Sequence, residues 1–324
     1  MAENIGKAQK QGSEESQKPS LSDRVHGKLE HYYNTHYKIL AIIPSIIGIL
    51  AILLIFMHYQ QTGDYMDRGI SLKGGTTLLV TVDRELNIDT LGADFRDQFP
   101  KGEFNIRALK SQGVTNSISI ETSLGGDAIN KQLIPILEKE LGHKLGKNDY
   151  SINTIGSSLS ESFFQEMLKI LLFAFLLMGI VVFITFRSAV PSFYVMLCAF
   201  FDMAITLAVA NLLSIKITTA GIAAFLMLIN FSVDSDMLLT ARILRRDPGI
   251  TPYQGFVSAF LTGMTMTATV LAAVFVAYLF TNSPDIKQIM IILLIGLVVD
   301  VIVTWLQNAA FCRWYVDSMA KKGK

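Results

Sequence analysis

The chain has 324 residues, of which 51% are hydrophobic, and a formal net charge of only +1. So small a net charge argues against a nucleic-acid partner, and a mean hydropathy of +0.42 is high for a water-soluble protein. The two cysteines, Cys198 and Cys312, fall in or beside apolar runs, so we expect no disulfide framework. No CxxC, HExxH or phosphate-loop pattern occurs. We therefore expect neither an enzyme nor a bound metal or organic cofactor.

Six apolar segments are each long enough to cross a bilayer, which takes about 20 residues. The first, Ile39 to Met57, begins too far along the chain and lacks the small-residue cleavage site of a signal peptide. The other five are Ile170–Phe186, Ser188–Ile215, Ile217–Ala241, Phe256–Phe280 and Gln288–Cys312. We predict a first transmembrane helix over residues 38–58 and a five-helix bundle over residues 161–313.

The segments outside the spans set the orientation. Residues 1–37 are rich in Gln, Glu, Ser and Lys and predict a flexible tail, and residues 314–324 form a second, short tail. Lys and Arg gather in both tails and in the connections after the second and fourth spans. By the positive-inside rule, both termini are cytoplasmic in a multi-pass protein of the cytoplasmic membrane.

The polar segment 59–160 then lies outside the membrane. Its β-branched and aliphatic runs predict strands at 76–82, 104–109, 114–120 and 150–155, and its amphipathic runs predict helices at 89–99 and 127–141. The order β-α-β-β-α-β fits a ferredoxin-like α+β domain. No Ser, His and Asp set occurs in it, so we interpret the domain as a binding or moving part rather than a catalyst.

Both junctions between this domain and the spans carry a local signal. Gly74 and Gly75 precede the first strand, and we predict a hinge or bend there because glycine accepts backbone angles that other residues avoid. A phosphate loop is disfavoured because no Gly-Lys-Ser/Thr follows. At the return to the membrane, Ser158 and Glu161 have the spacing of a helix capping box.

Four aspartates interrupt the spans, namely Asp202, Asp234, Asp236 and Asp300. A carboxylate at membrane depth costs roughly 2.5 to 3.5 kcal/mol on insertion scales. No Lys or Arg lies in the middle of any span to neutralise them. Either they bind protons, or they face water, or a partner chain supplies compensating groups. A simpler interpretation is that they are neutral acids whose hydrogen bonds hold helices together.

The rise of an α-helix gives the depth of each acid. Asp202 and Asp300 lie roughly 20 Å from the cytoplasmic end of their spans, and Asp234 lies about 12 Å from it. We therefore expect the third, fourth and sixth spans to bring carboxyl groups to similar levels. Asp234 and Asp236 are about 200° apart on a regular helix and face different ways. Such acids can form a proton relay.

Three polar residues on the fourth span complete the candidate site. Asn230 lies one turn before Asp234, and Thr240 lies one turn after Asp236, so each can form a hydrogen bond with an acid. Arg242 is placed to anchor the cytoplasmic end of this span.

Three stretches carry a family resemblance. Phe231 to Ile243 (FSVDSDMLLTARI) resembles the fourth-span signature of the SecD/SecF protein-export family. Gly69 to Thr77 resembles its Gly-x-x-x-x-Gly-Gly element, and Phe201 to Leu207 (FDMAITL) resembles its third span. Six spans with one outside domain suit the SecF branch. Ser71-Leu72 and the spacing Asp234-Ser-Asp236 depart from the bacterial pattern and look like the archaeal type.

The resemblance implies a subunit that pairs with SecD, joins the Sec translocon channel and helps unfolded exported polypeptides to leave on the outer side. It also implies membership of the resistance-nodulation-division superfamily, in which protons moving through intramembrane carboxylates drive outside domains. Two alternatives share the same acids: an exporter of small solutes or lipids from that superfamily, and a translocon scaffold that uses no proton gradient.

Overall fold

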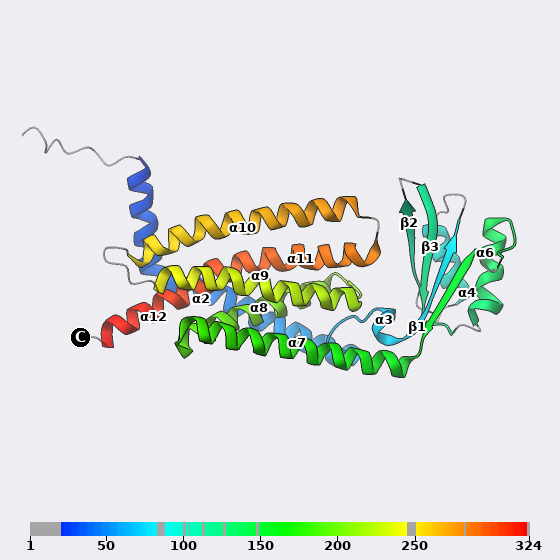
Figure 1. Cartoon of the computed structure of the whole chain (residues 1–324), viewed down its shortest axis with the longest axis horizontal. Coiled ribbons are helices and arrows are strands. Elements are labelled where there is room, and N and C mark those ends of the chain that lie inside the picture. Colours follow the sequence, from blue (N-terminus) through cyan, green and yellow to red (C-terminus); the bar gives the residue numbers. More distant parts are fainter. Residues whose placement is uncertain are drawn as a thin grey trace, which may run out of the picture.

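The molecule is an elongated helical bundle with one small sheet domain at its end (Figure 1). In this computed structural model, the described residues are 21–322 without 83–87, 100–101, 103, 112–113, 126–127, 147–148, 245–250 and 282. Among them, six helices are long and apolar enough to cross a membrane. The predicted class, a six-span helical membrane protein with one α+β domain after the first span, is therefore confirmed.

The spans are continuous helices that run beyond their apolar centres. They are α2 (Leu21–Thr62), α7 (Ser157–Phe186), α8 (Ala189–Leu212), α9 (Thr219–Leu244), α10 (Pro252–Phe280) and α11 (Pro284–Ile302), the last continuing through the π-helix η2 (Val303–Asn308) into α12 (Ala309–Lys322). Residues 21–37 are thus helical, although the sequence predicted a flexible tail over residues 1–37, and residues 314–322 of the short C-terminal tail are helical as well. Residues 1–20 lie outside the described part. The apolar pattern marks only the lipid-crossing stretch, whereas backbone hydrogen bonding continues until a breaker intervenes.

The domain at the end of the bundle has one antiparallel sheet in the order β2-β3-β1-β4. Its elements are β1 (Gly75–Thr81), α4 (Ile88–Gln98), β2 (Phe104–Ser111), β3 (Val114–Thr122), η1 (Ile129–Leu133), α6 (Ile134–Leu141) and β4 (Tyr150–Ile155). The chain order β-α-β-β-α-β is the predicted one. Assignment to the ferredoxin-like class stays a prediction.

Alternation along the strands builds the domain core. Leu78 and Val80 of β1 are buried while Leu79 between them is exposed, as expected for a sheet covered on one face. Leu78 is paired with Ile120 across the sheet, and this apolar surface packs against helical side chains that include the fully buried Phe95. The domain therefore has an apolar core of its own.

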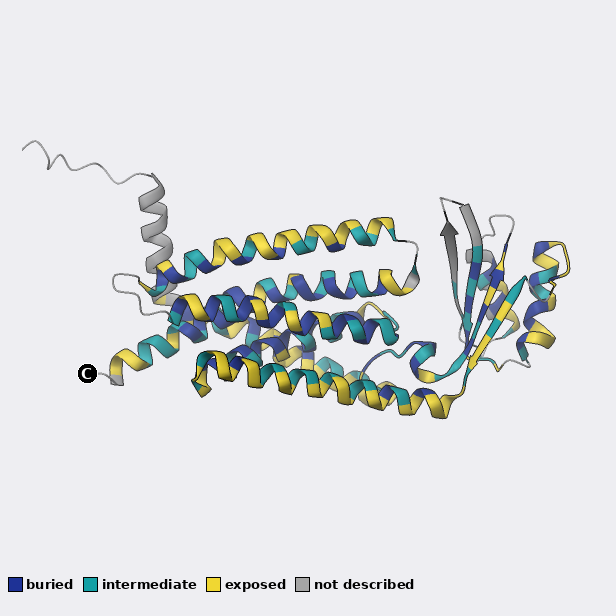
Figure 2. Ribbon diagram, in the orientation of Figure 1, coloured by how far each residue is buried: buried dark blue, intermediate teal, exposed yellow. Residues whose placement is uncertain are grey.

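Burial divides the bundle into inner and outer helices (Figure 2). The ribbons of α7 and α10 are largely exposed in this view. Many of the exposed residues of α2, α7 and α10 are large and apolar, which suits contact with lipid. Helices α8 and α9 are much more buried, and α9 packs closely against both α8 and α11. The helices that carry the four aspartates therefore adjoin one another.

The predicted capping box at the start of α7 is wrong. The helix begins directly after Gly156, which caps it without a side-chain hydrogen bond. Ser158 consequently lies inside the first turn, where its hydroxyl is no longer in the capping position. Glu161 instead forms an ion pair with Arg68, at 2.6 Å.

Close contact between α9 and α11 depends on Gly296. A Cβ atom at this position would lie 2.5 Å from a methyl carbon of Leu228, whose side chain is fully buried. We predict that Gly296→Ala lowers the thermal stability of the detergent-solubilised protein, because overpacking costs about 1–3 kcal/mol. Gly179→Ala is the control, since its Cβ would meet only the flexible Met196 at 3.5 Å. Both changes gain the same helix propensity, so equal melting temperatures would contradict this packing.

Candidate functional site

Three of the four aspartates meet in the middle of the bundle. Asp202 of α8, Asp236 of α9 and Asp300 of α11 are each 0% exposed, and their carboxyl groups are close enough to interact electrostatically. The depth estimate from sequence thus brought the correct helices together. We call these three residues the carboxyl cluster.

A single hydroxyl group connects two members of the carboxyl cluster. The Oγ1 atom of Thr304 lies 2.9 Å from Oδ1 of Asp236 and 3.0 Å from Oδ1 of Asp300. A threonine hydroxyl carries one proton but can also accept hydrogen bonds. Both contacts are therefore full hydrogen bonds only when one carboxyl group is protonated and donates to Thr304. The geometry suits a cluster that holds at least one proton.

An amide and a serine hydroxyl supply further hydrogen bonds to the carboxyl cluster. The Nδ2 group of Asn308 donates to Oδ1 of Asp236 at 2.8 Å and reaches Oγ1 of Thr240 at 3.3 Å. Thr240 is thus connected to Asp236 through Asn308 rather than by the direct hydrogen bond that the sequence predicted. Ser232 donates to Oδ2 of Asp202 at 2.5 Å. Asp202 and Asp236 therefore each accept a hydrogen bond from a donor of their own, whereas Asp300 shares the hydroxyl of Thr304 with Asp236.

Each carboxyl group also keeps an oxygen without a hydrogen-bond partner among the described residues: Oδ1 of Asp202, Oδ2 of Asp236 and Oδ2 of Asp300. No Lys or Arg in the described ranges forms an ion pair with them. An uncompensated buried charge costs several kcal/mol, so all three groups cannot be ionised together at low cost. The arrangement can take up, hold and release protons.

The supporting donors Thr304 and Asn308 were missed by the sequence analysis. They follow Asp300 at steps of four residues, so the three residues form one stripe along the end of α11 and η2. That spacing was the signal in the sequence that could have indicated them. The π-helical turn that contains both donors is a local feature that is frequent at functional sites and has no pattern in this sequence.

Asp234 lies away from the carboxyl cluster. As the helical angle predicted, its side chain faces another direction than Asp236: it is exposed and lines a cavity of about 460 Å³ between α9, α10 and α11. Asn230 is exposed as well, and no hydrogen bond joins it to Asp234 in the described part of the chain. Ser235 lines the same cavity and also lies against Asp300. It is the link between the cavity and the carboxyl cluster.

The remaining predicted residues lie at the two ends of the bundle. Arg242, in the last turn of α9, donates to Oγ of Ser258 in α10 at 2.7 Å. At the other end, Gly74 and Gly75 have φ angles of +88° and +152°. A Cβ atom on Gly74 would lie 2.6 Å from Cα of Ser157. The bend is thus tightly packed and specific for glycine, and a hinge role stays a prediction.

Across the described residues, no group of His, Cys, Asp and Glu side chains has an arrangement that could hold a metal ion.

The model of the family "Protein export membrane protein SecD/SecF, C-terminal" matches residues 137–318. The protein-export membrane protein SecF of Pyrococcus furiosus is 32% identical over 301 residues, which cover 92% of this chain and 97% of that protein.

This chain belongs to the SecD/SecF family. SecF of Methanocaldococcus jannaschii is 36% identical over 295 residues, covering 88% of this chain and 98% of that protein. Among solved structures, SecDF of Thermus thermophilus superposes with a TM-score of 0.65 at 16% identity. This chain spans 38% of that longer chain, and at such identity the likeness shows a shared fold only. Together with six spans, SecF relatives identify a multi-pass membrane subunit of a protein-export family.

Removing the shared hydroxyl tests its place in the carboxyl cluster. We predict that Thr304→Val lowers the free energy of unfolding by about 1–3 kcal/mol, because it leaves buried carboxyl oxygens without their donor. Thr269→Val is the matched control, since that hydroxyl donates only to the backbone carbonyl of Thr265 on an exposed face. Thermal unfolding in detergent measures both. An equal effect of the two changes would contradict the bonded cluster.

Proposed function

We propose that this protein is an accessory subunit of the Sec protein-export machinery and uses the proton gradient to help polypeptides cross the cytoplasmic membrane. Membership of a protein-export family supports the pathway. The observation that carries the energetic part is the carboxyl cluster, in which three spans contribute buried acids without a neighbouring cation in the described residues.

Protons would move by changing the partner of Thr304. When the proton lies on Asp236 or on Asp300, the direction of the hydrogen bond through Thr304 differs, and so does the preferred spacing of α9 and α11. The cavity at Asp234 would supply protons from water, with Ser235 between that cavity and Asp300. Proton transfer is thereby tied to helix position.

A partner chain would complete the membrane part. Asp234 and Asn230 are exposed on a bundle whose outer surface is otherwise largely apolar, and exposed polar groups at membrane depth favour contact with protein or water over lipid. This chain aligns with 38% of the longer SecDF chain, and the name of that protein suggests SecD as the partner. We infer that SecD covers this surface, next to the Sec translocon channel.

The proposed orientation places both termini in the cytoplasm and the sheet domain outside, where it would contact the emerging unfolded polypeptide. In this role the protein catalyses no covalent reaction and needs no cofactor, with the proton as the coupling ion.

Neutralising single acids tests the proposal. In proteoliposomes that contain this protein, SecD and the translocon channel, we expect Asp236→Asn and Asp300→Asn to reduce gradient-driven export and proton uptake by roughly 10²-fold or more, the usual scale for a lost proton-transfer group. Asp234→Asn should slow proton entry. Asp285→Asn, exposed near the start of α11, is the matched control and should leave both rates unchanged.

Three outcomes would contradict the proposal. Wild-type rates in both Asp236→Asn and Asp300→Asn would remove the proton relay. Export that this protein stimulates equally without a proton gradient would indicate a scaffold. A small molecule that co-purifies with the protein and is transported by it, in place of SecD, would indicate a solute or lipid exporter.

A further inference from the structure

The segment between the first span and the sheet domain, residues 63–74, is held to the bundle by several hydrogen bonds and ion pairs. We call it the strap. The guanidinium group of Arg68 in the strap forms ion pairs with Asp64 and Glu161, each at 2.6 Å. It also lies 4.7 Å above the ring of Phe164. Since Glu161 and Phe164 belong to the start of α7, Arg68 holds the strap against that helix.

The strap also pairs with the connection between α8 and α9. Ile217 donates its N–H to the carbonyl of Asp67 at 2.6 Å and accepts from the N–H of Gly69 at 2.8 Å. The side chain of Asn211, in the last turn of α8, donates to the carbonyl of Tyr65 at 3.0 Å and accepts from the N–H of Asp67 at 3.3 Å. Main-chain and amide bonds thus hold the strap on both sides of Arg68.

The same connection continues to α11. Thr218, directly before α9, forms a hydrogen bond with Gln288 of α11, and Gln288 donates to the carbonyl of Lys216. The helices α8, α9 and α11 are therefore bonded, through Asn211, Thr218 and Gln288, to one junction with the strap. These three helices are the ones that carry the carboxyl cluster.

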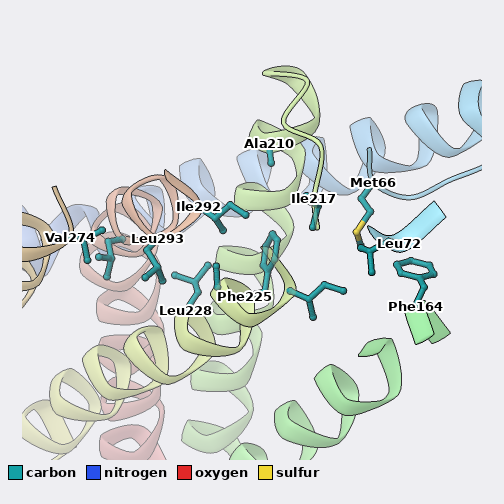
Figure 3. Close-up of a cluster of buried hydrophobic side chains, with 13 residues drawn as sticks. Met66, Leu72, Phe164, Ala210, Ile217, Phe225, Leu228, Val274, Ile292 and Leu293 are labelled. Carbon is teal, nitrogen blue, oxygen red and sulfur yellow. The ribbon is translucent and has the colours of Figure 1, made fainter. Parts of the chain in front are cut away.

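Apolar packing fills the space beneath these bonds. Leu72 of the strap and Ile217 are both 0% exposed, and they belong to one cluster with Met66 and Phe164 (Figure 3). After Leu72 the strap contains no free loop, because Gly74 packs against the start of α7 and β1 begins at Gly75. Close-packed interiors have low compressibility and transmit strain, so we expect these elements to move together.

We propose that this junction mechanically couples the carboxyl cluster to the sheet domain, and that Arg68 is its positioning residue. A displacement of α8, α9 or α11 reaches the strap through Asn211, Ile217 and Gln288, and the strap passes it to β1. Arg68 holds the strap against α7, because its planar guanidinium group binds two carboxylates at once in a fixed geometry. A lysine ammonium group, on a flexible stem, lacks that fixed geometry. The physiological purpose of this coupling rests on the proposed function.

The test measures the placement of the sheet domain directly. Spin labels at Asn130→Cys in η1 and Leu279→Cys near the end of α10 report the distance between domain and bundle. The native Cys198 and Cys312 are buried, so we expect the label to leave them unmodified in the folded protein. The distance distribution is recorded by pulsed electron paramagnetic resonance with Asp236 intact and with Asp236→Asn. The two distributions, with Asp236 and with Asp236→Asn, are compared in the parent, in Arg68→Gln and in Lys73→Gln. Lys73 is an exposed basic residue of the strap, so its substitution serves as the control.

We expect Asp236→Asn to shift the distribution in the parent and in Lys73→Gln, but not in Arg68→Gln, whose domain should also show a broader distribution. Arg68→Lys, which keeps the charge but not the fork, should restore part of the shift and guards against a folding defect in Arg68→Gln. Equal shifts with and without the Arg68 guanidinium, or no shift in the parent, would overturn the proposal. The readout needs no SecD, gradient or exported chain, so its failure is distinguishable from failure of the proposed function.

Discussion

The structure depends on one constraint: three carboxyl groups are buried at membrane depth without a cation beside them in the described residues. Such groups are expensive in a low-dielectric interior unless hydrogen bonds or protons compensate them. The bundle meets this with donors from neighbouring helices, Ser232 for Asp202 and Asn308 for Asp236, and with Thr304 between two acids. Close contact of α8, α9 and α11 follows from that need.

Under the proposed function, the same constraint would make the position of the helices depend on protonation. Because Thr304 has one proton to donate, the hydrogen bonds among Asp236, Asp300 and Thr304 would rearrange on gain or loss of a proton. The π-helical turn of η2 lies at this point, where the helix is already locally widened. Small changes in the middle of the bundle can thus alter how its helices pack.

At the domain end, the three acid-bearing helices converge on a junction instead of ending in loose loops. The strap exchanges backbone hydrogen bonds with Ile217, and Arg68 joins it to α7. Loops with this many satisfied polar groups are rigid in comparison with solvated connections. The chain passes between bundle and sheet domain twice, through the strap and at the start of α7. Both segments are held by hydrogen bonds or ion pairs.

Sequence by itself determined the class, the spans and the helices that carry the acids, because hydropathy and helical rise are local properties of the chain. It also determined that Asp234 and Asp236 face apart. Only the tertiary structure decided that Asp234 lies outside the carboxyl cluster, that Thr304 and Asn308 complete that cluster, and that Glu161 pairs with Arg68 rather than capping its helix. Those partners come from segments far apart in the chain, and which uncharged donor meets a buried acid is settled by packing, which leaves no periodic trace in a single sequence.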